Sequence, residues 1–160
     1  MKKTFELPKE FAEKWINALE SENYKQTNYG TLATVDYAID EDGAEDYGKP
    51  KMETCAYCCL GVAAVISGCE FDQITGFDLL NDHEDFFEEK KIPEILLSPE
   101  ENNLVGVLTS LNDGCTLSRL KEFKSVFPNL KFPKEEFKKT RIYYNFKEIA
   151  EFIKLNVEFV

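Results

Sequence analysis

The amino-acid sequence predicts a mainly α-helical fold of the α+β class: a compact helical domain around a central buried helix, with a small β-sheet or hairpin. Three observations support this prediction. Apolar residues recur every three to four positions in several segments, one segment is apolar on all sides, and another alternates polar with apolar residues. The chain has 160 residues, 43% of them hydrophobic, so it can bury a core, and we expect one domain over residues 1–160.

The first helix is expected to begin at Pro8, because proline suits the first turn of a helix. An apolar stripe at helical spacing follows, formed by Phe11, Trp15, Ile16 and Leu19. A stripe of this width predicts a helix that buries one face against the rest of the domain.

A strand is predicted over residues 31–39, where apolar and polar residues alternate. Residues 40–50 are rich in acidic side chains and glycine, and predict a charged loop at the tip of a hairpin. An EF-hand calcium site does not fit this loop. With Gly43 at position 6, position 1 is Ala38 and position 12 is Lys49, and neither of these is an acid.

The segment from Cys58 to Ser67 has no charged residue and no polar face. A helix that is apolar all round belongs in the centre of a domain. Gly61 and the small residues after it would let neighbouring elements approach closely. Gly68 is expected to end this helix, because glycine tolerates the left-handed conformation of a helix cap.

The C-terminal half predicts further helices. A short helix is expected around residues 84–90, and Ser98 with Glu101 predicts a capping box before a helix that stops at residues 112–114. Another helix is closed by Pro128, and a brief strand over residues 141–144 is expected to pair with the earlier strand. A second capping box over residues 145–148 begins the last helix. The three apolar stripes are Leu104, Val105, Leu108 and Leu111; Leu117, Leu120, Phe123 and Phe127; and Phe146, Ile149, Ala150, Ile153 and Val157.

The chain is acidic, with 30 Asp and Glu residues against 19 Lys and Arg residues and a formal net charge of −11. Direct nucleic-acid binding is therefore disfavoured, because it depends on cations that neutralise phosphates. No stretch approaches the roughly 20 apolar residues that span a bilayer, and no apolar run of a signal peptide follows the N-terminus. Five cysteines, an odd number, fit reduced thiols, so we expect a cytoplasmic protein that does not bind membranes.

Several segments resemble, in order and rough spacing, a set of small uncharacterised bacteriophage and prophage proteins. The main features are a tryptophan-bearing N-terminal helix and the Tyr-Cys-Cys-Leu-Gly-Val sequence at residues 57–62. The other matching segments are Leu7-Pro8-Lys9-Glu10, Lys14-Trp15, Ala18-Leu19, Tyr24-Lys25-Gln26, Leu32, Leu111-Asn112-Asp113-Gly114 and residues 146–153. Two segments depart from the pattern: residues 33–56 look like an enlarged hairpin, and residues 115–145 like an insertion. The resemblance implies a phage accessory role in the cytoplasm of an infected bacterial host.

No catalytic residue, metal ligand or cofactor site is predicted. Cys55 and Cys58 have CxxC spacing, but a structural zinc site needs four ligands, and the chain has no second CxxC or CxxH. Cys58 and Cys59 enter an apolar helix, where cysteine behaves as a small hydrophobic residue. His83, the only histidine, lies in an acidic stretch and is interpreted as a surface residue. Phosphate-loop and dinucleotide-binding motifs are absent from the sequence.

Eight residues are candidates for binding a small nucleotide-like ligand. Tyrosines offer faces for stacking, amides can recognise base edges, and arginines bind phosphates. A structural interpretation stays open, because Asn112-Asp113-Gly114 is a good helix stop and Gln26 can hold a neighbouring turn. The candidates are Tyr24, Lys25, Gln26, Asn112, Asp113, Arg119, Arg141 and Tyr143.

Three functions are therefore considered. The first is a non-enzymatic phage protein that counters host antiviral defence by binding and sequestering a small nucleotide immune signal. The second is an acidic inhibitor that covers a basic surface on a host defence enzyme, imitating nucleic acid, through Asp40, Glu41, Asp42, Glu45 and Asp46. The third is an enzyme that degrades a nucleotide signal. Each is compatible with a homo-oligomer.

Overall fold

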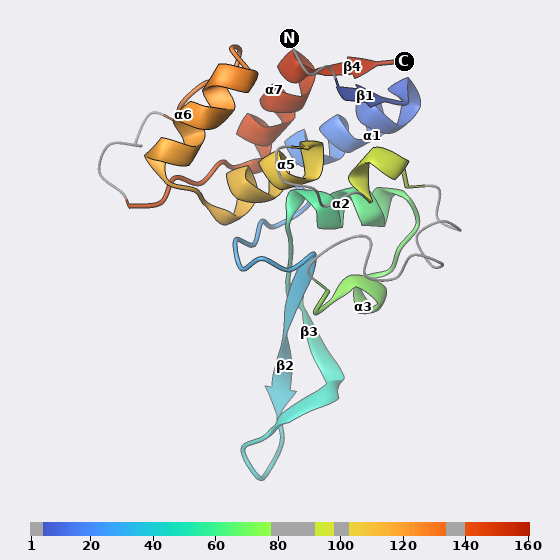
Figure 1. Cartoon of the computed structure of the whole chain (residues 1–160). Coiled ribbons are helices and arrows are strands. Elements are labelled where there is room, and N and C mark those ends of the chain that lie inside the picture. The colour runs from blue at the N-terminus through green and yellow to red at the C-terminus, as the bar shows by residue number, and fades with distance from the viewer. Residues whose placement is uncertain (1–4, 78–91, 98–102, 134–139) are drawn as a thin grey trace.

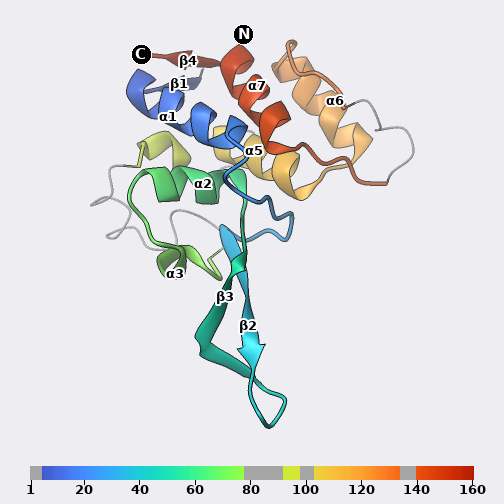
Figure 2. The same ribbon diagram turned by 180° about the vertical axis from the view of Figure 1, so that it is seen from behind.

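The computed structural model describes residues 5–77, 92–97, 103–133 and 140–160, and these residues form the predicted, mainly helical α+β fold (Figure 1). Most of the helices gather into one part of the molecule, and a two-stranded hairpin projects from it. The view from behind shows the same division (Figure 2). We call the helical part the body, and the hairpin, residues 33–57, the arm.

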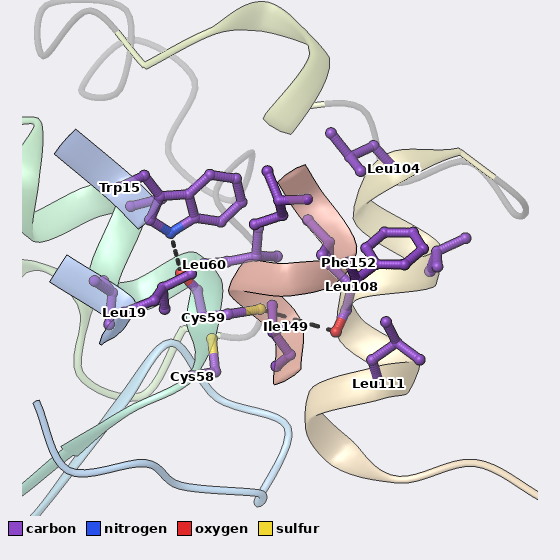
Figure 3. Packing of buried hydrophobic residues seen from close by; sticks show 14 of the residues in the cluster. Trp15, Leu19, Cys58, Cys59, Leu60, Leu104, Leu108, Leu111, Ile149 and Phe152 are labelled. Carbon is purple, nitrogen blue, oxygen red and sulfur yellow. Dashed lines mark hydrogen bonds between the residues drawn. The ribbon is translucent and has the colours of Figure 1, made fainter. Parts of the chain in front are cut away.

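Helix α1 (Lys9–Glu20) forms where the apolar stripe predicts it. Trp15 is fully buried, and its indole N–H donates a hydrogen bond to the Cys59 carbonyl at 2.9 Å (Figure 3). This bond satisfies the polar edge of a large aromatic side chain and joins α1 to the central helix. The other buried residues of α1 are Ala12, Ile16 and Leu19.

Helix α2 (Cys59–Ile66) is the central buried helix that the sequence predicts. It is buried from Cys59 through Ala64 and contacts α1 and α5 (Leu104–Asp113). The Cys59 thiol donates a long hydrogen bond, 3.8 Å, to the Leu108 carbonyl of α5 (Figure 3). Gly68 follows the helix with φ +100°, the left-handed conformation expected of it.

Gly61 lets α2 lie against the chain that leads into the arm. A Cβ atom on Gly61 would stand 1.8 Å from the Leu32 carbonyl oxygen, so no side chain fits at this position. The Gly61 N–H donates to the Cys58 sulfur at 3.3 Å, which makes Cys58 the N-cap of the helix. These contacts give Cys58 and Gly61 of the Tyr-Cys-Cys-Leu-Gly-Val sequence a structural role.

Helices α6 (Leu117–Val126) and α7 (Phe146–Asn156) complete the body, and α7 contacts both α1 and α5. The capping box predicted for α7 is confirmed. The Glu148 N–H donates to Asn145 Oδ1 at 2.8 Å, and the Asn145 N–H donates to Glu148 Oε1 at 3.0 Å. The buried residues of α7 are Phe146, Ile149, Ala150, Phe152 and Ile153.

A parallel pair of short strands, β1 (Phe5–Leu7) and β4 (Val157–Phe159), is not predicted by the sequence. Val157, expected at the end of the last helix, is instead the first residue of β4. Backbone hydrogen bonds from the Val160 N–H to the Leu7 carbonyl and from the Lys9 N–H to the Val160 carbonyl, both 3.0 Å, extend this pairing. Three residues are too few for an alternating pattern to identify a strand.

Other local predictions are corrected or fall outside the described residues. Helix α5 begins at Leu104 with Asn103 as its N-cap, while the capping box at Ser98 and the short helix at 84–90 lie outside the described residues. Residues 141–144 do not form a strand with the arm; Ile142 makes an isolated bridge with Cys115. Between α2 and α5 the described regular elements are α3 (Phe71–Ile74) and η2 (Glu94–Leu96).

The arm pairs β2 (Ala33–Ile39) with β3 (Glu45–Tyr57) in antiparallel fashion. Because β3 begins at Glu45, the charged loop predicted over residues 40–50 narrows to residues 40–44. Asp40 holds this turn: its Oδ1 accepts hydrogen bonds from the backbone N–H groups of Asp42 and Ala44, both at 2.9 Å.

The base of the arm is fixed to the body on both strands. On the β3 side, Tyr57 accepts a backbone hydrogen bond from Thr27 and donates one to Lys25, both at 2.8 Å. Where the chain enters β2, the Leu32 N–H donates to the Phe77 carbonyl at 2.7 Å. The direction in which the arm projects is therefore set by the body.

Candidate interaction site

The candidate ligand-binding residues lie mostly around the C-terminal end of α5, at residues 112–115. Gln26 and Asn112 meet on one side of this end. On the other side, Arg141 contacts Gly114, and Arg141 and Arg119 both act electrostatically on Cys115. The structure therefore brings together residues that are far apart in the sequence, but most of them are engaged with the protein itself.

Asn112 is completely buried and acts as a junction between three segments: residues 26–27, Cys59 and the end of α5. Its Oδ1 accepts hydrogen bonds from Gln26 Nε2 at 3.0 Å and from the Cys59 N–H at 3.2 Å. Its Nδ2 donates to the Thr27 carbonyl at 2.8 Å and to Asp113 Oδ1 at 2.9 Å. All four hydrogen-bonding positions of the amide are thus used inside the fold, and no group of this side chain is left to recognise a base edge.

Gln26, Tyr24 and Lys25 also serve the fold. Gln26 Nε2 makes a second hydrogen bond, to the Tyr144 carbonyl at 2.8 Å. Tyr24 packs edge-on against Tyr57, with ring centroids 5.6 Å apart. The Lys25 side chain is exposed, whereas its backbone carbonyl holds the base of the arm.

The two arginines and Tyr143 surround Gly114 and Cys115. Arg141 Nη2 donates to the Gly114 carbonyl at 3.2 Å. Gly114 has φ +95°, and a Cβ on it would stand 2.6 Å from the Tyr143 ring, so the ring lies directly over the glycine. Arg119 pairs with Glu122 at 2.8 Å, and its guanidinium carbon lies 4.8 Å from the centre of the Phe123 ring.

Two cavities show how much room a small ligand would find. The one beside Asn112 and Asp113, lined also by Cys58, Cys59 and Thr109, has a volume of about 10 Å³, close to that of a single water molecule. A groove of about 340 Å³ lies between residues 129–133 and α7, within the size range of small-molecule sites. Its lining, which includes Phe132, Tyr144 and Leu155, contains none of the eight candidate residues.

Three buried cysteines, Cys58, Cys59 and Cys115, are poorly suited to redox or nucleophilic chemistry. Burial raises the pKa of the Cys58 thiol to about 12 and that of the Cys59 thiol well above its ordinary value. Burial also raises the pKa of Cys115, although Arg141 and Arg119 oppose the shift. At neutral pH these three sulfurs are therefore thiols, not the thiolate that attacks substrates or binds metals.

The arm carries exposed acidic side chains and exposed large apolar ones. Residues 33–57 hold seven acidic residues against two lysines. Within the described part of the chain, the carboxylates of Glu41, Asp42 and Glu45 are exposed and make no hydrogen bond or ion pair. Large apolar side chains of the arm are exposed as well: Tyr47 is 74% exposed, Ile39 61% and Met52 49%.

Among the described residues, no three Cys, His, Asp or Glu side chains come together where they could hold a metal ion. His83 lies outside this part of the chain. The helices that the structure describes are all too short or too polar to cross a membrane. Comparison of the chain with models of protein families, with curated proteins and with solved structures finds no match in any of the three.

The exposed aromatic residues of the arm are the feature that sequence reasoning missed. The alternation over residues 31–39 places Ile39 in a strand, and an alternating strand is expected to bury one face. Tyr47 and Met52 stand among charged residues, where burial is unexpected. Large apolar residues interleaved with like charges are therefore the sequence feature that could have pointed to an exposed aromatic surface.

Proposed function

We propose that this chain is a non-enzymatic protein-interaction module that uses its acidic arm to cover a basic surface on another protein. The single observation that carries the proposal is the arm itself: it projects from the body with unpaired carboxylates at its tip and a base hydrogen-bonded on both strands. The resemblance to phage proteins adds the context of a host defence enzyme as the target.

A fixed arm suits this role for two physical reasons. Binding loses less conformational entropy when the recognition element is already held in position, and the base of the arm is held at Tyr57 and Leu32. A concentrated negative charge also steers a basic partner toward the tip and repels acidic ones. The net charge of −11 acts in the same direction over the whole molecule.

Sequestration of a small nucleotide signal is kept as a second candidate because of the 340 Å³ groove beside α7. Two lysines that line the groove, Lys131 and Lys147, would attract phosphates. Both are already in ion pairs, Lys131 with Glu151 and Lys147 with Glu22. The lining also includes the carboxylates of Glu148 and Glu151. Asn112 and Gln26, two of the eight candidate residues, form hydrogen bonds inside the fold. Mixing the protein with cyclic dinucleotides and cyclic ADP-ribose isomers, then recovering intact ligand after denaturation, tests this candidate; altered ligand would instead indicate an enzyme.

The arm proposal is tested with two variants that change net charge equally. The tip variant carries Glu41→Lys, Asp42→Lys and Glu45→Lys. Asp40 and Asp46 are left in place, because their carboxylates accept backbone hydrogen bonds that shape the arm. The body variant carries Glu6→Lys, Glu13→Lys and Glu94→Lys, which are exposed residues away from the arm.

Each protein is immobilised and exposed to bacterial lysate at about 0.05 M and about 0.5 M salt, and the retained proteins are identified by mass spectrometry. We expect basic proteins to be retained by the wild type and the body variant at low salt, lost at high salt, and lost with the tip variant. The same retained set with all three proteins, or none with any of them, would overturn the proposal.

A further inference from the structure

Two tyrosines form an exposed corner on the arm. The rings of Tyr37 on β2 and Tyr47 on β3 meet edge-on, with centroids 5.0 Å apart and planes inclined at 75°. Tyr47 is 74% exposed, and Tyr37 is half-buried. We call this pair the tyrosine corner. The pair lies on the acidic arm, and Tyr47 is its exposed member.

An irregularity of β3 places Tyr47 on this corner. Tyr37 pairs with Pro50 and the next residue, Ala38, pairs with Asp46, so residues 47–49 are extra on β3 and bulge out of the ladder. Asp46 shapes the bulge, because its Oδ1 accepts the Gly48 N–H at 3.0 Å and its carboxylate lies 3.9 Å from Lys49 Nζ. Bulges of this kind re-aim a side chain, and here the re-aimed side chain is an exposed aromatic ring.

The edges of the arm are poorly suited to binding by strand addition. Pro50 has no N–H to donate, two register irregularities interrupt the ladder, and Lys49 and Lys51 place charge on β3. These are features that prevent an edge strand from pairing with another chain. A second copy of this chain is also a poor partner, since the two arms would bring like charges together. The side chains of the arm, not its backbone edges, are therefore left as the binding surface.

We propose that the tyrosine corner receives an arginine side chain from the basic partner of the arm. This inference rests on the proposed function. A guanidinium is attracted by the negative face of an aromatic ring and stacks flat against it, so arginine gains more from this site than lysine of the same charge. The excess of acidic residues on the arm, seven against two lysines, adds a general attraction for a cation. The partner surface would thus be rich in arginine and not merely basic.

The probes are two synthetic peptides of equal charge, octa-arginine and octa-lysine, titrated against the whole protein at low salt. Affinity is measured by calorimetry, and the ring ¹H–¹³C signals of the tyrosines are followed by NMR. The variants are Tyr47→Leu, which removes the ring, and Tyr47→Phe, which keeps it. Tyr29→Leu is the matched control, because Tyr29 is 86% exposed and lies outside the arm.

We expect the wild type to bind octa-arginine about two- to fivefold more tightly than octa-lysine. Tyr47→Leu should remove this preference, while Tyr47→Phe and Tyr29→Leu should keep it, and the ring signals of Tyr37 and Tyr47 should shift with octa-arginine. Equal affinity of the wild type for both peptides, or a preference that survives Tyr47→Leu, would overturn the inference.

Failure of this inference can be told apart from failure of the proposed function. If the tip variant weakens both peptides while Tyr47→Leu changes nothing, the acidic arm binds by charge alone and the tyrosine corner is excluded. If the tip and body variants weaken both peptides equally, the arm has no special role and the proposed function fails with it. Circular dichroism spectra of each variant confirm that the body stays folded.

Discussion

Replacement of Asn112 by alanine should strongly destabilise the protein, because this buried side chain joins three segments. Asn112→Ala leaves the Cys59 N–H and the Thr27 carbonyl without partners in the interior, since each is bonded to the Asn112 amide. An unsatisfied buried polar group costs about 1–3 kcal/mol, so two of them give about 2–6 kcal/mol. Gln26 keeps its bond to the Tyr144 carbonyl and adds little to this loss.

The loss is measured by urea and thermal unfolding, followed by circular dichroism. A loss of about 4 kcal/mol lowers Tm by about 8–16 °C for a chain of this size. Asn129→Ala is the matched control, because Asn129 is exposed and its amide makes only a 3.5 Å contact with the Leu155 carbonyl. This control should change the free energy of unfolding by less than about 0.5 kcal/mol. If Asn112→Ala is as mild as the control, Asn112 is not a structural junction, and its role as a ligand-binding amide returns.

Asn112→Asp tests the direction of the two hydrogen bonds that the amide donates. A carboxylate there would face the Thr27 carbonyl and the Asp113 carboxylate, so burial and like charge would raise the pKa of the new carboxyl above that in the unfolded chain. A raised folded-state pKa means that stability is kept at low pH and lost as pH rises through that pKa. The wild type lacks this loss, so identical pH profiles of the two proteins would refute the hydrogen-bond assignment.

Three further predictions follow from other contacts. Gly61→Ala should lower the free energy of unfolding, measured in urea, by at least about 2–3 kcal/mol. The new Cβ would stand 1.8 Å from the Leu32 carbonyl oxygen, a backbone atom that cannot move aside alone. A mild effect would mean that α2 and the arm can separate. Glu158→Lys should stabilise by about 0.2–1 kcal/mol, because Glu6 and Glu158 are exposed partners on the parallel pair. Glu158→Gln should give a smaller gain, and both gains should shrink at high salt, which screens the repulsion in the wild type. Cys58 should resist alkylation by iodoacetamide at pH 8 in the native protein and react in urea, because burial raises the pKa of its thiol to about 12. Labelling is detected by mass spectrometry, and rapid labelling of the native protein would contradict the burial of Cys58.

Elements with a strong local pattern are the ones that the sequence predicts correctly. The α7 capping box depends on two residues three positions apart, Asn145 and Glu148, and both bonds form. The central helix is identified by an apolar run that leaves no face for solvent. The β1–β4 pair depends instead on bringing together residues more than 150 positions apart, and three residues carry no period. Such pairing depends on the tertiary fold, so no local sequence pattern predicts it.

The candidate site shows a different limit of sequence reasoning. The sequence allows two interpretations of Asn112, a ligand-binding amide and part of a helix stop, and the helix stop is confirmed by Gly114 at φ +95°. Its main role is neither of these. Whether an asparagine is exposed depends on which segments converge on it, and Gln26, Thr27 and Cys59 lie 53–86 positions away in the sequence. Helix-stop chemistry can be inferred from neighbouring residues, but a buried junction cannot.

The Tyr-Cys-Cys-Leu-Gly-Val sequence is best understood as the joint between the arm and the body. Tyr57 ends β3 and bonds to the chain at Lys25 and Thr27, while the Cys58 N–H donates to the Leu32 carbonyl at 3.1 Å and Gly61 leaves space for that same carbonyl. The central helix thus begins immediately after the arm ends. A change at Gly61 should therefore affect two properties together, the stability of the body and the direction of the arm. If the arm is the binding element, Gly61→Ala should weaken partner binding even at temperatures where the variant is still folded. If Gly61 only stabilises the body, the variant should lose binding only when it unfolds.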